Sequence, residues 1–361
     1  MIEKYEKLPY IIAYMTNFIY LSRYAGMRED LVQAGGGNSS VKISSDKMVL
    51  KASGFQLADL SEEMGWCTVN PKIITNFFNQ DTPDISKEVE KQLIANSLTT
   101  PSQYRPSIEI FLHSITQKYT LHTHPTVVNI LTATDAGWKI LKELFSDAVF
   151  VNYSTPGINL AAEYFNAVKK FGKIPNVIFL QNHGLVVSGE TAEFVKEKTE
   201  NVLRIIEKGI EIDMERYHTA TNIYDTVCKI PELKNKIVYL SQNNDVIKGL
   251  ENFSSNLWDY QFCPDCLVYC GKRILVLWDT FSETDFQNHL VQYGQPVIVT
   301  CKNNVYILAD SVKKAKDIES VLAFSAQVAI VNKNSHINLL PDNEQNFLLN
   351  WDSEKYRQSA R

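Results

Sequence analysis

The residues best suited to chemistry are concentrated in residues 107–125, which hold three of the seven histidines and a glutamate. His122 and His124 lie two positions apart, so on a β-strand both side chains would leave the same face. Two such imidazoles repel each other once protonated and gain little unless a cation lies between them, whereas a single buried histidine is usually a hydrogen-bonded core residue. The spacing therefore predicts a metal-chelating pair.

A third histidine is expected at the same site. His183 follows the apolar run 177–180, which predicts a buried strand with His183 just beyond its end. Three neutral imidazoles are a usual donor set for catalytic zinc, and they leave a fourth coordination position open to substrate. We predict that His122, His124 and His183 bind Zn²⁺ or another divalent metal.

Glu109 lies four residues before His113, so a helix opened by Pro106 and Ser107 would place both side chains on one face. Without the histidines, Glu109 would be interpreted as an exposed helix residue. Near a metal it has two roles available, as a ligand or as the acid/base that moves a proton next to a polarised carbonyl. On the residues alone both roles stay open for Glu109, and we expect His113 to pack or to support Glu109 by a hydrogen bond.

Two turns rich in small residues precede this segment. The first, within residues 34–42, has three consecutive glycines followed by Asn38, and the second contains Ser53 and Gly54. Glycine lets the backbone approach a ligand closely, and the neighbouring amide and hydroxyl groups add hydrogen-bond donors. A single glycine-rich turn is more often a hairpin, but two in succession favour a cradle for an anionic group.

Composition narrows the classes of function. Hydrophobic residues at 45% and charged residues at 21% are ordinary for a globular protein, and 361 residues allow two or three domains. A net charge of −5 offers no basic field for nucleic acid, and no apolar run approaches the length of a membrane span. We therefore expect neither a nucleic-acid nor a membrane partner.

The cysteines and the N-terminal sequence indicate a compartment. Six cysteines in so long a chain do not resemble a secreted disulfide framework, and no signal peptide precedes the first helix, so we expect a cytoplasmic protein with reduced thiols. Cys263 and Cys266 form a C-x-x-C motif without a second copy. We expect structural or incidental thiols there rather than a redox pair or half of a zinc site.

The hydrophobic pattern alternates helices and strands over residues 1–218, which predicts one α/β domain that ends in a long helix over 190–217. Residues 219–259 are richer in Asn, Ser and Lys and predict a connecting region. Residues 260–361 predict a smaller α/β lobe. The sequence features that predict this lobe are apolar runs at 267–269 and 274–277, a capped helix at 282–285, strands at 297–299 and 305–308, and a helix over about 312–331.

Taken together, residues 15–215 resemble the class II aldolase/adducin family. The matching motifs occur in the family's order and as a set are specific: residues 36–40, 53–54, 106–109 with His113, 122–125, 153–157 and 182–184. The resemblance implies a three-layer α/β/α domain with a central mixed sheet, in which His122, His124 and His183 bind zinc and Glu109 is the catalytic acid/base. It further implies that a substrate phosphate is bound by Gly37, Asn38, Ser53, Gly54 and Ser107. Ile108 stands where the fuculose-phosphate branch has a second serine.

The resemblance also implies a reaction. The expected protein is a zinc-dependent lyase that cleaves or forms a carbon–carbon bond in a ketose 1-phosphate through a metal-stabilised enediolate, as a homo-oligomer, commonly a tetramer. A sugar-phosphate epimerase or dehydratase of the same family and a non-catalytic module as in adducin are the alternatives. Family epimerases carry aspartate at the position of Glu109, and a module need not retain metal ligands, so the sequence favours the lyase.

The C-terminal lobe is similar to the extension of long rhamnulose-phosphate aldolases that are fused to a dehydrogenase. The dehydrogenase signature G-x-G-x-x-G after a strand does not occur in this sequence.

Overall fold

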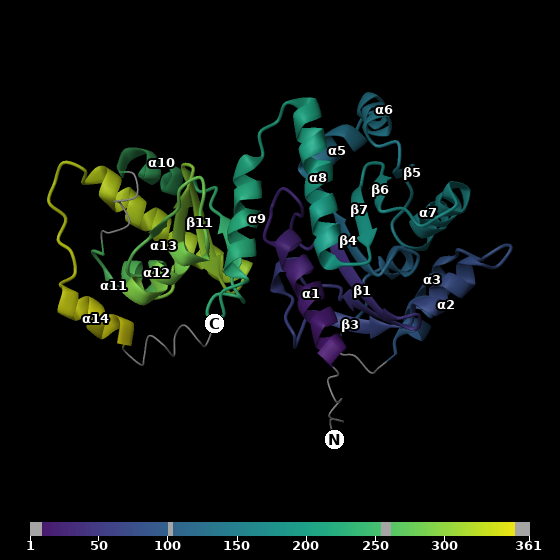
Figure 1. The fold of residues 1–361 in the computed structure, drawn as a ribbon, viewed down its shortest axis with the longest axis horizontal. Helices are drawn as coiled ribbons and strands as arrows, with labels where there is room; N and C mark the ends of the chain where they lie inside the picture. The colour runs from purple at the N-terminus through teal and green to yellow at the C-terminus, as the bar shows by residue number, and fades with distance from the viewer. Residues whose placement is uncertain (1–8, 100–103, 254–260, 351–361) are drawn as a thin grey trace, which may run out of the picture. The chain divides into compact units, whose positions relative to one another are not determined.

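The computed structural model describes residues 9–99, 104–253 and 261–350, and the chain divides into two compact units, Met1–Asp213 and Met214–Arg361 (Figure 1). Among these described residues, no helix is both long and apolar enough to cross a membrane.

The first unit is built on a mixed sheet whose described strands follow the order β3-β2-β1-β4-β7-β6-β5. Neighbouring strands pair antiparallel, except that β5 and β6 are parallel. The site is carried by the central strands β1, β4 and β7. The strand bounds are β1 Asn38–Ser44, β2 Lys47–Lys51, β3 Trp66–Val69, β4 Tyr119–Thr123, β5 Val149–Val151, β6 Val177–Leu180 and β7 Gly184–Gly189.

Helices cover both faces of this sheet (Figure 1). On one face α1, α5 and α8 contact the central strands, and α6 packs on α5. On the other face α2, α3, α4 and α7 bury an apolar cluster against β2, β3, β5 and β6. The predicted three-layer α/β/α domain with a central mixed sheet is thereby confirmed. The helix bounds are α1 Pro9–Gly26, α2 Pro71–Phe78, α3 Lys87–Ser97, α4 Ile110–Ser114, α5 Thr126–Thr132, α6 Asp135–Leu144, α7 Ile158–Phe171 and α8 Ala192–Ile210, with a short 3-10 helix, η1 Leu57–Asp59.

The long helix predicted over 190–217 is interrupted. Helix α8 ends at Ile210 because Glu211 adopts a left-handed conformation with φ of 55°, and its N–H bonds to the Glu207 carbonyl. The N–H of Ile212 bonds to the same carbonyl at 3.1 Å. A new helix, α9, starts at Glu215. The helical periodicity runs through both helices, so the pattern alone did not reveal the turn between them.

The second unit contains a four-stranded sheet of order β8-β11-β10-β9, and α10, α11 and α13 pack beside it. The expected connecting region 219–259 contains most of α9, strand β8 and α10, and β8 pairs with β11. Residues 254–259 of this region lie outside the described part of the chain. The apolar run 267–269 lies in helix α11, whereas 275–276 forms β9. The bounds are α9 Glu215–Val227, β8 Ile237–Leu240, α10 Asn244–Phe253, α11 Pro264–Cys270, β9 Leu275–Val276, α12 Glu283–Tyr293, β10 Ile298–Cys301, β11 Asn304–Ala309, α13 Val312–Val331 and α14 Asp342–Asn350.

The predicted cap of α12 is present. Ser282 is the N-cap residue, and its backbone N–H donates to the Asp285 carboxylate at 2.8 Å, which completes a capping box.

Candidate metal centre and acid–base site

The three predicted histidines converge on one point. The Nε2 atom of His122 lies 3.1 Å from Nε2 of His124 and 3.3 Å from Nε2 of His183. One potential ligand atom from each ring lies within 4.8 Å of the other two, so within the described part of the chain these three side chains form a group that could hold a metal ion.

The sheet and two glycines set the positions of these rings. His122 lies within β4, opposite Val186 of β7, and His183 lies in the turn that leads into β7. A Cβ on Gly184 would lie 2.3 Å from the Thr123 carbonyl and 3.1 Å from the His124 ring, so no side chain fits there. A Cβ on Gly36 would lie 3.0 Å from the other edge of that ring. The His124 imidazole is therefore packed between two backbone segments that need glycine.

The environment keeps the three imidazoles neutral. Burial lowers the pKa of His122 well below its usual value, and repulsion from the other two rings lowers it further. Burial also lowers the pKa of His124, to about 4, and that of His183. The His122 Nδ1 atom lies 3.1 Å from the Leu185 carbonyl, to which it donates, so Nε2 is the lone-pair nitrogen that faces the other rings. Neutral nitrogens converging in this way fit a divalent metal such as zinc.

Glu109 is half-buried and occupies the N-cap position of α4. Burial raises the pKa of its carboxyl to about 7, and the nearby positive charge of Lys51 partly opposes this rise. Both protonation states of Glu109 are populated near neutral pH, which suits an acid/base. The helix was predicted to begin at Pro106 and Ser107 but begins at Ile110, because Pro106 is extended in an antiparallel bridge with Ala52.

Lys51 was not identified from the sequence as part of the site. Lys51 is the last residue of β2 and is 3% exposed. Burial lowers the pKa of its ammonium group to about 8, and the negative charge of Glu109 partly opposes this fall. The sequence feature that could have revealed Lys51 is its position at the end of an apolar strand, directly before the small-residue turn 52–54. A buried lysine needs a counter-charge, and Glu109 supplies one.

His113 supports the sheet rather than Glu109. Its ring is fully buried, and Nδ1 lies 2.7 Å from the Ser40 hydroxyl of β1. Within the described residues no hydrogen bond joins the side chains of His113 and Glu109, and the Nε2 atom of His113 is buried without a partner. Of the two expected roles, packing is observed and the hydrogen bond to Glu109 is not. Burial lowers the pKa of His113 to about 3, so this ring is neutral too.

The residues predicted to hold phosphate lie on neighbouring segments. The Ser53 N–H donates to the Arg105 carbonyl at 2.8 Å, and the Ser107 hydroxyl accepts from the Glu109 N–H at 3.3 Å. Asn38 of β1 lies opposite His122, and its buried side-chain oxygen has no partner within the described chain. The remaining two are glycines with positive φ, Gly37 at 73° and the exposed Gly54 at 86°.

Ile108 adds no hydrogen-bond donor from its side chain to this region. The side chain is 40% exposed, and it lies so close to Gly157 that a Cβ there would be 2.9 Å away.

The C-x-x-C motif forms a close thiol pair. Cys263 and Cys266 are both free, with Sγ atoms 3.2 Å apart. Burial raises the pKa of the Cys266 thiol to about 12 and that of Cys270 further still. Within the described residues these thiols do not belong to a group that could hold a metal.

Residues 17–208 match the family model "Class II Aldolase and Adducin N-terminal domain". One curated relative is the "Uncharacterized oxidoreductase YuxG" of Bacillus subtilis (strain 168), 26% identical over 202 residues. The match covers 53% of this chain and 29% of that relative, so the chain spans less than a third of the relative's length.

Two solved structures are similar. The N-terminal class II aldolase domain of a conserved protein from Thermoplasma acidophilum is 27% identical with a TM-score of 0.48, covering 54% of this chain and 92% of the other. The L-fuculose-1-phosphate aldolase from Thermus thermophilus is 15% identical with a TM-score of 0.38, covering 55% and 94%. The family model spans more than half of the sequence, and this chain therefore belongs to the class II aldolase and adducin N-terminal domain family.

Proposed function

We propose that this protein is a metal-dependent lyase that cleaves or forms a carbon–carbon bond in a sugar phosphate, with a ketose 1-phosphate as the substrate class. The observation that carries the proposal is the convergence of three neutral imidazole nitrogens, from His122, His124 and His183. In the same unit, burial raises the pKa of the Glu109 carboxyl to about 7.

The imidazoles would hold the metal and leave part of its coordination sphere to substrate. A divalent cation held there would polarise the carbonyl and hydroxyl oxygens of the sugar and stabilise the negative charge left on carbon. The protein's part is to keep the three rings neutral and oriented. The bond from His122 Nδ1 to the Leu185 carbonyl serves this purpose, because it fixes the tautomer that presents Nε2.

Glu109 would carry the proton. In the cleavage direction one fragment loses a hydroxyl proton and becomes an aldehyde, while the other fragment gains a proton on carbon. Glu109 would accept the hydroxyl proton as a base and return it to the carbon of the other fragment as an acid, and in the reverse direction the two transfers would run in the opposite order. Lys51 favours the carboxylate form electrostatically, so it keeps the pKa of Glu109 near neutrality rather than above it.

The small-residue segments would bind the anionic end of the substrate. Ser53, Gly54 and Ser107 lie on segments joined by backbone hydrogen bonds, and the side-chain oxygen of Asn38 is buried without a partner among the described residues. We include in the proposal that the protein acts as a homo-oligomer, which light scattering of the purified protein tests directly.

A substrate screen tests the reaction. The metal content of the purified protein is measured, and a panel of ketose 1-phosphates is then assayed for aldehyde release with zinc and with a chelator. We expect zinc-dependent aldehyde release. A folded protein that neither contains nor takes up metal would overturn the proposal and favour an interaction module. Release of water or a change of configuration without aldehyde would instead indicate a dehydratase or an epimerase.

A further inference from the structure

We propose that Arg28, Asp30 and Glu200 form a positioning network that fixes the backbone of His124 and thereby sets the third ring of the metal centre. The inference deepens the proposed function, because it concerns how this chain orients a ligand of the proposed metal. None of the three side chains belongs to the converging group of histidines itself.

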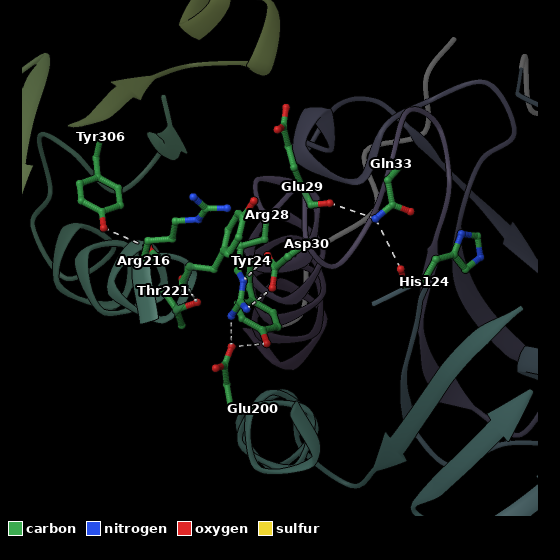
Figure 2. A network of polar contacts seen from close by, with 11 residues as sticks. Tyr24, Arg28, Glu29, Asp30, Gln33, His124, Glu200, Arg216, Thr221 and Tyr306 are labelled. Carbon is green, nitrogen blue, oxygen red and sulfur yellow. Dashed lines mark hydrogen bonds and ion pairs between the residues drawn. The ribbon is translucent and has the colours of Figure 1, made fainter. Parts of the chain in front are cut away.

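The network is a buried ionic cluster (Figure 2). The Arg28 side chain is fully buried just beyond α1; its Nε donates to Asp30 Oδ1 at 3.0 Å and its Nη2 to Asp30 Oδ2 at 2.6 Å. Its Nη1 bonds to Oε1 of Glu200 in α8. The hydroxyl of Tyr24 donates to the same Glu200 oxygen at 2.6 Å. The turn after α1 is thus tied both to itself and to α8.

The same turn holds the His124 segment through the backbone. The Leu31 carbonyl accepts from the His124 N–H at 2.8 Å, and the Asp30 carbonyl accepts from the Thr126 N–H at 2.8 Å. On the other side, Gln33 Nε2 lies 3.4 Å from the His124 carbonyl, to which it donates (Figure 2). Asp30 therefore links the two halves, because its carboxylate binds Arg28 and its carbonyl binds Thr126.

His124 needs this support more than His122 does. His122 lies inside the strand ladder, between Asn38 and Val186. The ladder ends with the pair Thr123 and Leu185, so His124 lies one residue beyond it, and its N–H is bonded by the Arg28 turn instead of a neighbouring strand.

The charge state of the network suits a fixed geometry. Burial alone lowers the pKa of Arg28, but Asp30 and Glu200 outweigh this and hold the pKa above its usual value. Burial and Glu200 raise the pKa of Tyr24, so its hydroxyl stays a donor. Buried ion pairs are weak stabilisers compared with apolar packing, whereas a two-pronged arginine–carboxylate pair fixes orientation. A role in positioning therefore accounts for the cluster better than stability does.

The test uses the full chain with Asp30→Asn, which keeps the carbonyl and the shape of Asp30 but weakens the two-pronged pair. Arg28→Lys keeps the charge but loses the fork. Leu141→Ala is the matched control, because it removes a buried side chain of α6, and no hydrogen bond links that side chain to His124. One readout is the Zn²⁺ dissociation constant from chelator competition. The other is amide hydrogen exchange of His124 and Thr126 in metal-free protein, relative to Leu121 inside β4.

We expect Asp30→Asn and Arg28→Lys to weaken zinc binding about 10- to 100-fold, as for other groups that orient metal ligands. We also expect both variants to speed exchange at His124 and Thr126 relative to Leu121, and Leu141→Ala to change neither readout. An unchanged exchange ratio and dissociation constant in Asp30→Asn would overturn the inference, as would equal weakening in Leu141→Ala. If the wild-type protein bound no zinc, the proposed function would fail, and the exchange ratio alone would decide the positioning role.

Discussion

The Nε2 atoms of His122 and His183 lie 3.3 Å apart although 61 positions separate the two residues in the chain. His122 is carried by β4 and His183 by the turn into β7, and these strands are neighbours in the sheet. The pairing of two strands thus builds the centre of the candidate site. Because the sheet does not depend on the rings themselves, single ligands can be removed without removing the fold.

Replacing His122 with alanine should abolish both zinc binding and turnover while leaving a folded protein. The ring supplies the central nitrogen of the cluster, 3.1 and 3.3 Å from the other two. Metal content, turnover and circular dichroism check this. His336→Ala removes an exposed histidine of the second unit and serves as the control that keeps its metal. A His122→Ala protein with normal metal content would contradict the assignment.

The metal-free protein should lose stability as the pH falls from about 6.5 to about 4. The folded state holds the pKa of His124 at about 4, so between these values the unfolded chain binds more protons and is favoured. For His124 alone the loss between pH 7 and pH 5 is at most about 2 kcal/mol, taking 1.36 kcal/mol per pKa unit. Urea unfolding in the presence of chelator measures it. His124→Gln should show a smaller loss over the same range, and an equal loss would argue against this cause.

Glu109→Gln should keep the metal and lower turnover by about 10²- to 10⁴-fold, the usual contribution of general acid–base catalysis. The amide has a similar shape but cannot exchange a proton. In the wild-type protein, solvent proton exchange at the reacting carbon of the ketone product needs the carboxylate form. Its rate should therefore rise with pH through about 7, the pKa of Glu109. Deuterium exchange followed by NMR checks the profile, and a Glu109→Gln protein that exchanges at the wild-type rate would remove Glu109 from the chemistry.

Lys51→Met should shift that profile to higher pH. Lys51 favours the charged form of Glu109, and without this cation burial alone sets the carboxyl pKa, which rises above about 7. The measurement is the same deuterium exchange as a function of pH. Lys47→Met, in the same strand, is the matched control and should leave the midpoint in place. A midpoint that moved to lower pH in Lys51→Met would show that the two charges do not interact as described.

The Cys266 thiol of the second unit should be inert at neutral pH. Burial raises the pKa of Cys266 to about 12, so little reactive thiolate is present. We expect slow alkylation of Cys266 by iodoacetamide at pH 7.5, followed by mass spectrometry, and unchanged turnover in the double variant Cys263→Ser, Cys266→Ser. Rapid labelling, or turnover that falls in the double variant, would favour a redox role.

Much of the first unit was predictable because its signals are local. Alternating apolar runs predicted the strands, and the two-residue spacing of His122 and His124 predicted that their rings meet. The failures arose where non-local contacts decided the outcome. The bridge between Pro106 and Ala52 delays the start of α4, and the bond to Ser40 takes His113 away from Glu109.

By itself, the sequence determined the family and the fold class, together with the residue types from which a metal centre could be made. Spacing and periodicity are properties of neighbours along the chain, and they are legible before folding. Only the tertiary structure decided that Lys51 faces Glu109 and that Arg28 ties the turn of Asp30 to α8. These relationships depend on burial and on contacts between distant segments. Burial and these contacts set the pKa values of Glu109 and Lys51 and fix the position of His124. Neither burial nor the contacts exist until the layers of the fold have packed.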